Sequence, residues 1–369
     1  MGKKKEKSEL QKAQEAAQKS IIKTNEKIGE LGEHVNGLSS VLDDMQCHFN
    51  AIRRFPKEHK SDITHAQELR LNWKQQAEVI QEDYEKSFKR SVGGGATGAG
   101  VGVAVAAMGP TAAMGVATTF GVASTGTAIS TLSGAAATNA ALAWLGGGAL
   151  AAGGGGMVAG EALLALAGPV GWSIAAVAVL SSGVMLIKNV QDKKRLEELF
   201  TLISKRDITT HKLAIVEMNE RIKRIQSEIE LLRDGLNKLK SFGLDYSKMT
   251  ERQQYELGAY VNFTSSATLL LTEPIAGLQP KYTEEDYYRF LSIMYREGYP
   301  DSYLKNKDAI VFLANLLFKI ELNKKDIGIL GRSFKADKKL LESLNTTKKD
   351  FDVGCVSLAV EAIEFKYVT

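Results

Sequence analysis

Glycine-rich stretches near the middle of the chain are the first residues whose types and spacing suggest chemistry, because phosphate-binding loops are built from glycine. The stretch GGGATGAG, residues 93–100, lacks the Lys-Ser/Thr pair that ends a P-loop. The stretch GAGVGVAVA, which begins at Gly98, does not complete the dinucleotide fingerprint after an expected strand. We therefore predict no nucleotide site and no bound cofactor.

The cysteines and histidines do not form a metal-ligand pattern either. Cys47 and His48 are adjacent, but the chain has no second pair at a zinc-site spacing, and Cys355 lies far away. The five histidines fall in polar parts of the sequence: His34, His48, His59, His65 and His211. We predict no metal site, no catalytic residues and no enzyme. The basic patch RIKRIQ is interleaved with glutamates, so no nucleic-acid partner is predicted.

The chain combines two chemically different materials. Residues 92–187 hold a single ionisable side chain, Glu161, and 22 of the 34 glycines. The other residues carry 89 of the 90 charged side chains of Lys, Arg, Asp and Glu. Because Ala, Val, Leu and Ile fill the spaces between these glycines, the block is not a solvated Gly/Ser linker. We predict a Gly/Ala-rich hydrophobic region that inserts into membranes.

The glycines of this block recur at helical spacing. Small residues spaced by four would lie on one helix face, where they let helices approach closely in an apolar medium. The stretch 170–187 is the best candidate for a spanning helix, with Trp172 as an interfacial anchor. The residues predicted to insert or to pack helices are Gly94, Gly98, Gly102, Gly148, Gly156, Gly160, Trp172, Leu180 and Leu186.

Basic residues stand at both edges of the block: Lys89, Arg90, Lys188, Lys193, Lys194 and Arg195. Under the positive-inside rule both edges would lie on one side of the membrane, so two or four passes are expected. Two interpretations of Glu161 are open: it is a turn residue at the far membrane interface, or a pore-lining carboxylate within the membrane.

Two heptad stripes flank the block. Apolar residues alternate steps of three and four in two segments, 28–52 and 215–239. Such stripes are typical of coiled-coil seams, which a single helix cannot bury alone. We expect the two arms to pair with each other, antiparallel, so that the apolar block sits as a head at one end of a stalk. The alternatives are ordinary bundle helices and a surface for a partner protein.

The end of the chain is aromatic and charged. Residues 241–266 resemble a connection, Thr283 is placed to cap a helix, and 308–322 reads as a buried helix. The expected fold class is all-α: an elongated bundle of long coiled-coil helices, a hydrophobic helical head, and a small α-helical C-terminal domain. The expected domains are residues 1–91 (first arm), 92–187 (membrane-insertion region), 188–245 (second arm) and 246–369 (C-terminal domain).

This order of parts resembles the α-helical pore-forming toxins of the cytolysin A type, which include tripartite haemolysin components. The resemblance is architectural, covers roughly residues 21–239, and is accompanied by a likeness of the glycine rows to glycine-zipper toxins. It implies a bundle that shelters a hydrophobic segment, then forms a homo-oligomer in a lipid bilayer and permeabilises it.

The function expected for the chain is that of a bacterial toxin or defence effector. The alternative is a constitutive integral membrane scaffold that binds protein partners through its coiled-coil arms or C-terminal domain. No apolar h-region follows the basic start, so no conventional secretory signal is expected. We expect a soluble cytoplasmic form that converts to a membrane-associated one, with export by a dedicated system left open.

Overall fold

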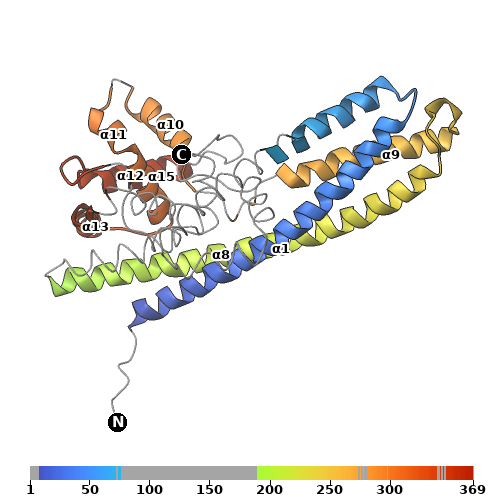
Figure 1. Ribbon diagram of the computed structural model, residues 1–369. Coiled ribbons are helices and arrows are strands. Elements are labelled where there is room, and N and C mark those ends of the chain that lie inside the picture. The colour runs from blue at the N-terminus through green and yellow to red at the C-terminus, as the bar shows by residue number, and fades with distance from the viewer. Residues whose placement is uncertain are drawn as a thin grey trace, which may run out of the picture.

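The structure is a computed structural model that describes residues 8–71, 74–75, 189–272, 275, 277, 281–296, 298–338, 341, 344 and 346–368 (Figure 1). Within these ranges the regular elements are helices, and the only extended pairing is an isolated bridge between Arg53 and Asp245. The predicted all-α class is confirmed. The apolar block, residues 92–187, lies outside the described residues.

Two long helices form the backbone of the molecule. Helix α1 spans Glu9–Ala51 and helix α8 spans Val190–Lys240. Ser8 and Gln11 close a capping box at the start of α1, and the Asn189 side chain accepts backbone hydrogen bonds at the start of α8. Both helices therefore have a defined first turn.

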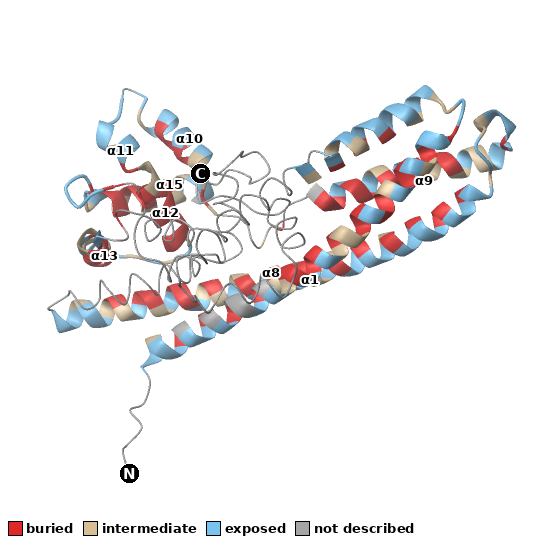
Figure 2. Ribbon diagram, in the orientation of Figure 1, coloured by how far each residue is buried: buried red, intermediate tan, exposed pale blue. Residues whose placement is uncertain are grey.

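The two heptad stripes are buried in one core, as predicted (Figure 2). On α1 the buried seam residues are Ile28, Leu31, Val35, Leu38, Leu42, Met45 and Phe49, and Ile52 follows directly after the helix. On α8 they are Met218, Ile222, Ile225, Ile229, Leu232, Leu236 and Leu239, with Ile215 partly buried beside them. The seam is therefore formed by the stripes of the two arms packed against each other.

The arms run parallel, so the antiparallel expectation is wrong. The ring of His34 lies 3.3 Å from the Gln226 side chain, and a Cβ atom on Gly37 would lie 3.4 Å from Ile229. Further along, Arg53 pairs with Asp245 in a parallel bridge. The separation in sequence stays nearly constant along these contacts. A heptad stripe has no direction, so the sequence pattern did not distinguish the two arrangements.

Two hairpins make the parallel pairing possible (Figure 1). After α1 the chain turns at residues 52–56, and a helical segment, residues 57–71, runs back along it. After α8 the short 3₁₀ helix η4 (Tyr246–Lys248) leads into α9 (Glu251–Thr272), which runs back in the same way. The result is a bundle of two helical hairpins side by side.

Helix α9 occupies most of the stretch 241–266 that the sequence suggested to be a connection, so that expectation is wrong. Leu257, Val261 and Leu271 of α9 belong to the same core as the seam. Between them the buried positions Thr264 and Thr268 are polar, and each hydroxyl donates to the carbonyl four residues earlier. These threonines break the apolar pattern by which the helix would have been recognised.

The C-terminal helices build a second core around the start of α8. They are α10 (Glu284–Met294), α11 (Asp301–Lys305), α12 (Lys307–Leu317), α13 (Lys324–Ala336) and α15 (Gly354–Val368). Thr283 caps α10 as predicted, and α12 is buried along its length. Leu196, Leu199, Phe200 and Ile203 of α8 contribute to this core. Helix α8 therefore takes part in both cores.

The described ends of the chain on either side of the apolar block lie far apart along the bundle. Lys74 contacts Asp43, which is level with about residue 235 of α8, whereas Asn189 stands at the opposite end of α8. At 1.5 Å per residue the difference is about 70 Å. The described ends therefore lie at different levels of the bundle, which follows directly from the parallel pairing, and the predicted head itself lies outside the described residues.

Candidate functional site: the two junctions of the apolar block

Most of the residues predicted to act in the membrane lie outside the described residues. They are Gly94, Gly98, Gly102, Gly148, Gly156, Gly160, Glu161, Trp172, Leu180 and Leu186, together with the edge residues Lys89, Arg90 and Lys188. In the part of the chain that the structure describes, no helix has the length and apolar character to cross a membrane. What the structure offers is the two places where the folded body meets the block.

The upstream junction is the helical segment 57–71, which packs on the bundle through a narrow row of buried side chains. Its buried side chains are Ile63, Ala66 and Arg70, at steps of three and four. Only the first two are apolar, and Ala66 is much smaller than the leucines of the seam. The third position, where a seam would carry an apolar residue, is a guanidinium group with 2% of its side chain exposed.

Arg70 is held by a network from α1 and α9. Its Nη1 donates to Thr268 Oγ1 at 3.1 Å, and its Nη2 donates to Gln46 Oε1 at 3.0 Å. Its Nε lies 3.6 Å from Asp43 Oδ1 and has no hydrogen-bond acceptor among the described residues. Burial lowers the pKa of Arg70, and the nearby Asp43 carboxylate opposes that shift. A buried charge whose hydrogen bonds go to neutral acceptors, with its carboxylate partner 3.6 Å away, is a costly attachment compared with an apolar side chain.

A cavity of about 240 Å³ lies beside this network. Asp43, Gln46, Asn50 and Gln67 line it, together with the exposed Cys47. The packing at Arg70 is therefore incomplete, and the space provides room for the side chains to move or for water to enter. Among the described residues, the upstream junction is therefore joined to the bundle by few apolar contacts and one buried polar network.

The downstream junction is the start of α8, and it is held firmly. Arg195 Nε and Nη2 donate to the two carboxylate oxygens of Asp326 at 2.8 and 2.9 Å. Asp326 has 1% of its side chain exposed and also accepts from the backbone of Asn323, which caps α13. The Arg195 guanidinium lowers the pKa of this carboxyl. Such a forked pair fixes orientation as well as distance.

Further contacts reinforce the downstream junction. Asp192 lies 3.3 Å from Arg332 and 3.6 Å from Lys325, both on α13. About three turns beyond Arg195 on α8, Arg206 Nη1 donates to the carbonyls of Leu316 and Phe318 at the end of α12, at 2.8 and 2.6 Å. Together with the apolar side chains of α8 in the second core, these bonds bind the start of α8 to the C-terminal helices.

The three described basic edge residues thus divide into two kinds. Lys193 and Lys194 are exposed and form no ion pair with the residues that the structure describes. Arg195 is occupied by Asp326, a partner 131 residues away that the sequence did not indicate. Groups of three or more metal-ligating side chains do not occur in the described ranges.

No protein-family model, curated protein or solved structure matches this chain. The two junctions therefore have to be interpreted from their own chemistry.

His48, near the end of α1, gives the bundle a pH dependence. Burial lowers the pKa of His48 below 6.5. The nearby Lys240 lowers this pKa further, whereas a hydrogen bond to the Leu239 carbonyl raises it. Well above this pKa the imidazole is neutral in the folded and in the unfolded chain. On acidification the unfolded chain takes up the proton first, because its histidine has the higher pKa. We expect the free energy of unfolding to fall as the pH is lowered from about 7 to about 5, measured by urea denaturation with circular dichroism.

Two variants test this prediction. The fall should be smaller in His48→Gln and the same as in wild type in His65→Gln, whose ring is exposed. Equal pH curves for all three proteins would contradict the prediction.

Proposed function

We propose that this protein is a non-enzymatic, membrane-inserting protein that permeabilises a lipid bilayer. The observation that carries the proposal is the block of 96 residues with one ionisable side chain, joined on both sides to a charged helical body. In water such a concentration of glycine costs helix stability, whereas in an apolar medium it lets helices pack closely. The folded body would serve to hold this block until it meets a membrane.

The contrast between the two junctions supports a direction for insertion. The helical segment 57–71 rests on Ile63, Ala66 and the buried Arg70, whereas the start of α8 is fixed by a forked ion pair and an apolar core. We propose that the upstream segment detaches first while α8 stays bound to the C-terminal helices. The released chain then gains the reach that the block needs to leave the body.

The finer architecture belongs to the same proposal. The long arms would form a coiled-coil bundle, the C-terminal helices a small domain, and the glycine rows the contacts between copies in the bilayer. Basic residues at the edges, including Lys193 and Lys194, would stay at the surface of the starting side.

A dye-release experiment tests the proposal. Purified protein is added to dye-loaded liposomes over a range of pH and lipid composition, and release is expected together with conversion of a soluble pool to a membrane-bound oligomer. Gly98→Leu with Gly156→Leu should block release because bulky side chains prevent close packing. Gly121→Leu with Gly126→Leu, in the same block but outside the two rows, is the matched control and should retain most of the release.

Two results would overturn the proposal. The first is the absence of binding and release under all conditions. The second is a protein that resists carbonate extraction from the moment of synthesis and never occurs in soluble form, which would favour a constitutive membrane scaffold.

A further inference from the structure

The end of the bundle at which both hairpins turn is a distinct surface, here called the tip. It comprises residues 51–62, from the first hairpin, and residues 238–252, from the second. The tip lies at the far end of the bundle from the C-terminal helices (Figure 1). It therefore reaches out from the molecule without being covered by any described element.

The two turns of the tip are locked together. Arg53 donates its backbone N–H to the carbonyl of Leu244 at 2.9 Å, and Tyr246 donates to the carbonyl of Arg53 at 3.1 Å. Arg54 adopts a left-handed backbone conformation, with φ of 60°, and its guanidinium donates to Ser247 at 2.7 Å. Phe55 packs against the rings of Phe49 and Tyr246 beneath the turns. The tip is thus a preformed surface.

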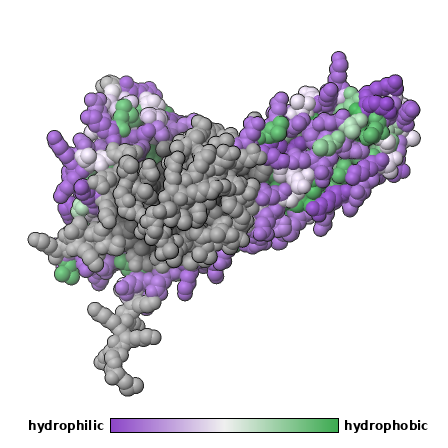
Figure 3. Space-filling view, in the orientation of Figure 1, coloured by the Kyte–Doolittle hydropathy of each residue, from purple (hydrophilic) through white to green (hydrophobic). Residues whose placement is uncertain are grey.

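Positive charge is concentrated at the tip. It carries eight Lys and Arg residues against four Asp and Glu residues, an excess as large as the net charge of +4 of the whole chain. Arg54 pairs with Asp245, and Lys238 and Arg252 pair with Glu256 of α9. The remaining cations form no ion pair with the described residues: Arg53, Lys57, Lys60, Lys240 and Lys248. The space-filling view shows this end of the bundle as strongly hydrophilic (Figure 3).

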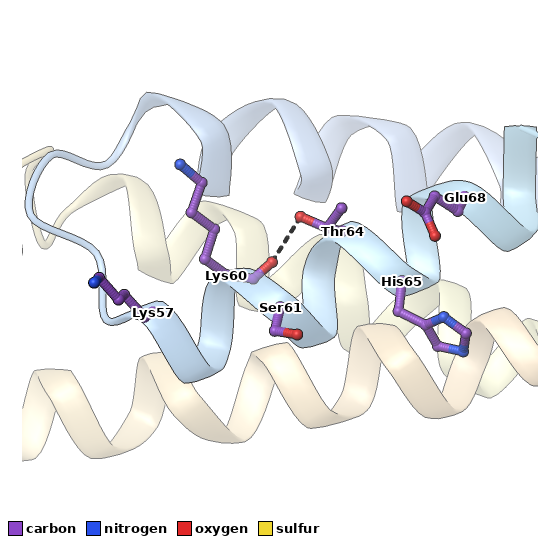
Figure 4. Close-up of a pocket in the computed structure, with 6 residues that line it drawn as sticks. All are labelled: Lys57, Lys60, Ser61, Thr64, His65 and Glu68. Carbon is purple, nitrogen blue, oxygen red and sulfur yellow. Dashed lines mark hydrogen bonds between the residues drawn. The ribbon is translucent and has the colours of Figure 1, made fainter.

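Apolar and hollowed surface accompanies these cations. The Leu244 side chain is 46% exposed between the two turns, and Phe242 is partly buried beside it. Along the outer face of the helical segment 57–71 runs an open hollow of about 530 Å³ (Figure 4). Lys57, Lys60 and Ser61, which belong to the tip, line one end of the hollow, and His65 and Glu68 line the other end. Cations around an exposed leucine and a polar hollow match the charged phosphates and the apolar layer of a lipid surface.

We propose that the tip docks the protein on a bilayer that contains anionic phospholipid. The inference rests on the proposed function, because it names the surface by which the soluble form first meets its membrane. Lys57, Lys60, Lys240 and Lys248 bind lipid phosphates, and Leu244 enters the headgroup region. A nucleic acid would also attract the lysines, but the exposed Leu244 on the same surface favours lipid.

Vesicle flotation with the full-length chain tests the docking. Wild-type protein should bind vesicles of phosphatidylcholine and phosphatidylserine more tightly than vesicles of phosphatidylcholine alone, and added salt should weaken that binding. Changing Lys57, Lys60, Lys240 and Lys248 to Gln should lower the partition coefficient on the order of a hundredfold, since each lysine at an anionic surface contributes several-fold. The matched control changes to Gln four exposed lysines in the C-terminal part of the chain, Lys305, Lys324, Lys348 and Lys349, and should bind within about twofold of wild type.

The outcomes separate this inference from the proposed function. The docking inference fails if the tip variant binds anionic vesicles as tightly as wild type does, or if the control variant loses as much binding as the tip variant. It also fails if the tip lysines are required for binding an RNA oligonucleotide while anionic lipid does not increase binding to vesicles. Dye release that is independent of the tip lysines would leave the proposed function standing without tip docking. Tip-dependent binding by a protein that never releases dye would support the docking and overturn the proposed function.

Discussion

Replacing Arg70 with Ala is expected to release the helical segment 57–71 while the seam of α1 and α8 stays folded. The change removes both hydrogen bonds that the guanidinium donates, to Gln46 and Thr268, and it leaves a hole beside an existing cavity. Breaking a buried polar network in this way costs about 3 kcal/mol, roughly a hundredfold in the local opening equilibrium. Hydrogen exchange should show this increase in the amides of 57–71.

The matched control replaces the polar pair by an apolar one. Arg70→Met with Gln46→Leu keeps the volume and removes the charge together with one of its buried acceptors, while Asp43 retains its contact with Lys74. Such replacements are often neutral or stabilising. We therefore expect slower exchange in 57–71 than in Arg70→Ala and slower dye release than in wild type. Faster exchange throughout α1 and α8 in Arg70→Ala would show instead that Arg70 supports the whole bundle.

The seam shows how far a sequence pattern predicts packing. Positions such as Leu38 and Leu232 were predicted to be buried because a heptad stripe must be covered, and both are. The relative direction of the arms was not predictable in this way, since parallel and antiparallel pairs bury the same stripe. Direction is fixed instead by the two turns, where Arg53 and Asp245 pair across almost two hundred residues.

The junctions show what the pattern could not indicate. Arg70 continues the spacing of Ile63 and Ala66, so a charged residue at a seam position was a visible signal for a buried network, although its partners were not. Arg195 was predicted to be a basic edge residue beside Lys193 and Lys194, and nothing in the sequence indicated that it forms a buried ion pair. Its partner Asp326 lies on a helix far away in sequence, and only the packing of α13 against α8 brings them together.

Replacing Arg195 with Ala is expected to destabilise the attachment of the C-terminal helices to α8. Asp326 would remain almost fully buried as a carboxylate without its cation, which costs about 3 kcal/mol in the free energy of unfolding. The exposed third of the Arg195 side chain admits some water to the pair, so the loss should not exceed this figure. Urea denaturation followed by circular dichroism measures the difference.

Asp326→Asn is the matched control. An amide oxygen still accepts the hydrogen bond from the backbone of Asn323, and the amide leaves no carboxylate buried without its cation. A smaller loss of about 1 kcal/mol in the free energy of unfolding is therefore expected.

The pH dependence of Arg195→Ala identifies the cause of the loss. In wild type the pKa of Asp326 is lowered from 3.8, so its contribution is present above that pH and disappears as the pH falls through the folded-state value. Without Arg195, burial favours the neutral acid, so protonation relieves the variant. The stability gap between the two proteins should therefore begin to narrow above pH 3.8, where the variant takes up its proton, and continue to narrow as the pH falls through the lowered wild-type pKa. A gap that stays constant would assign the loss to packing. Because α8 is proposed to stay bound to the C-terminal helices during insertion, Arg195→Ala should not speed dye release, whereas Arg70→Ala should. Faster dye release in Arg195→Ala than in Arg70→Ala would reverse the proposed direction of insertion.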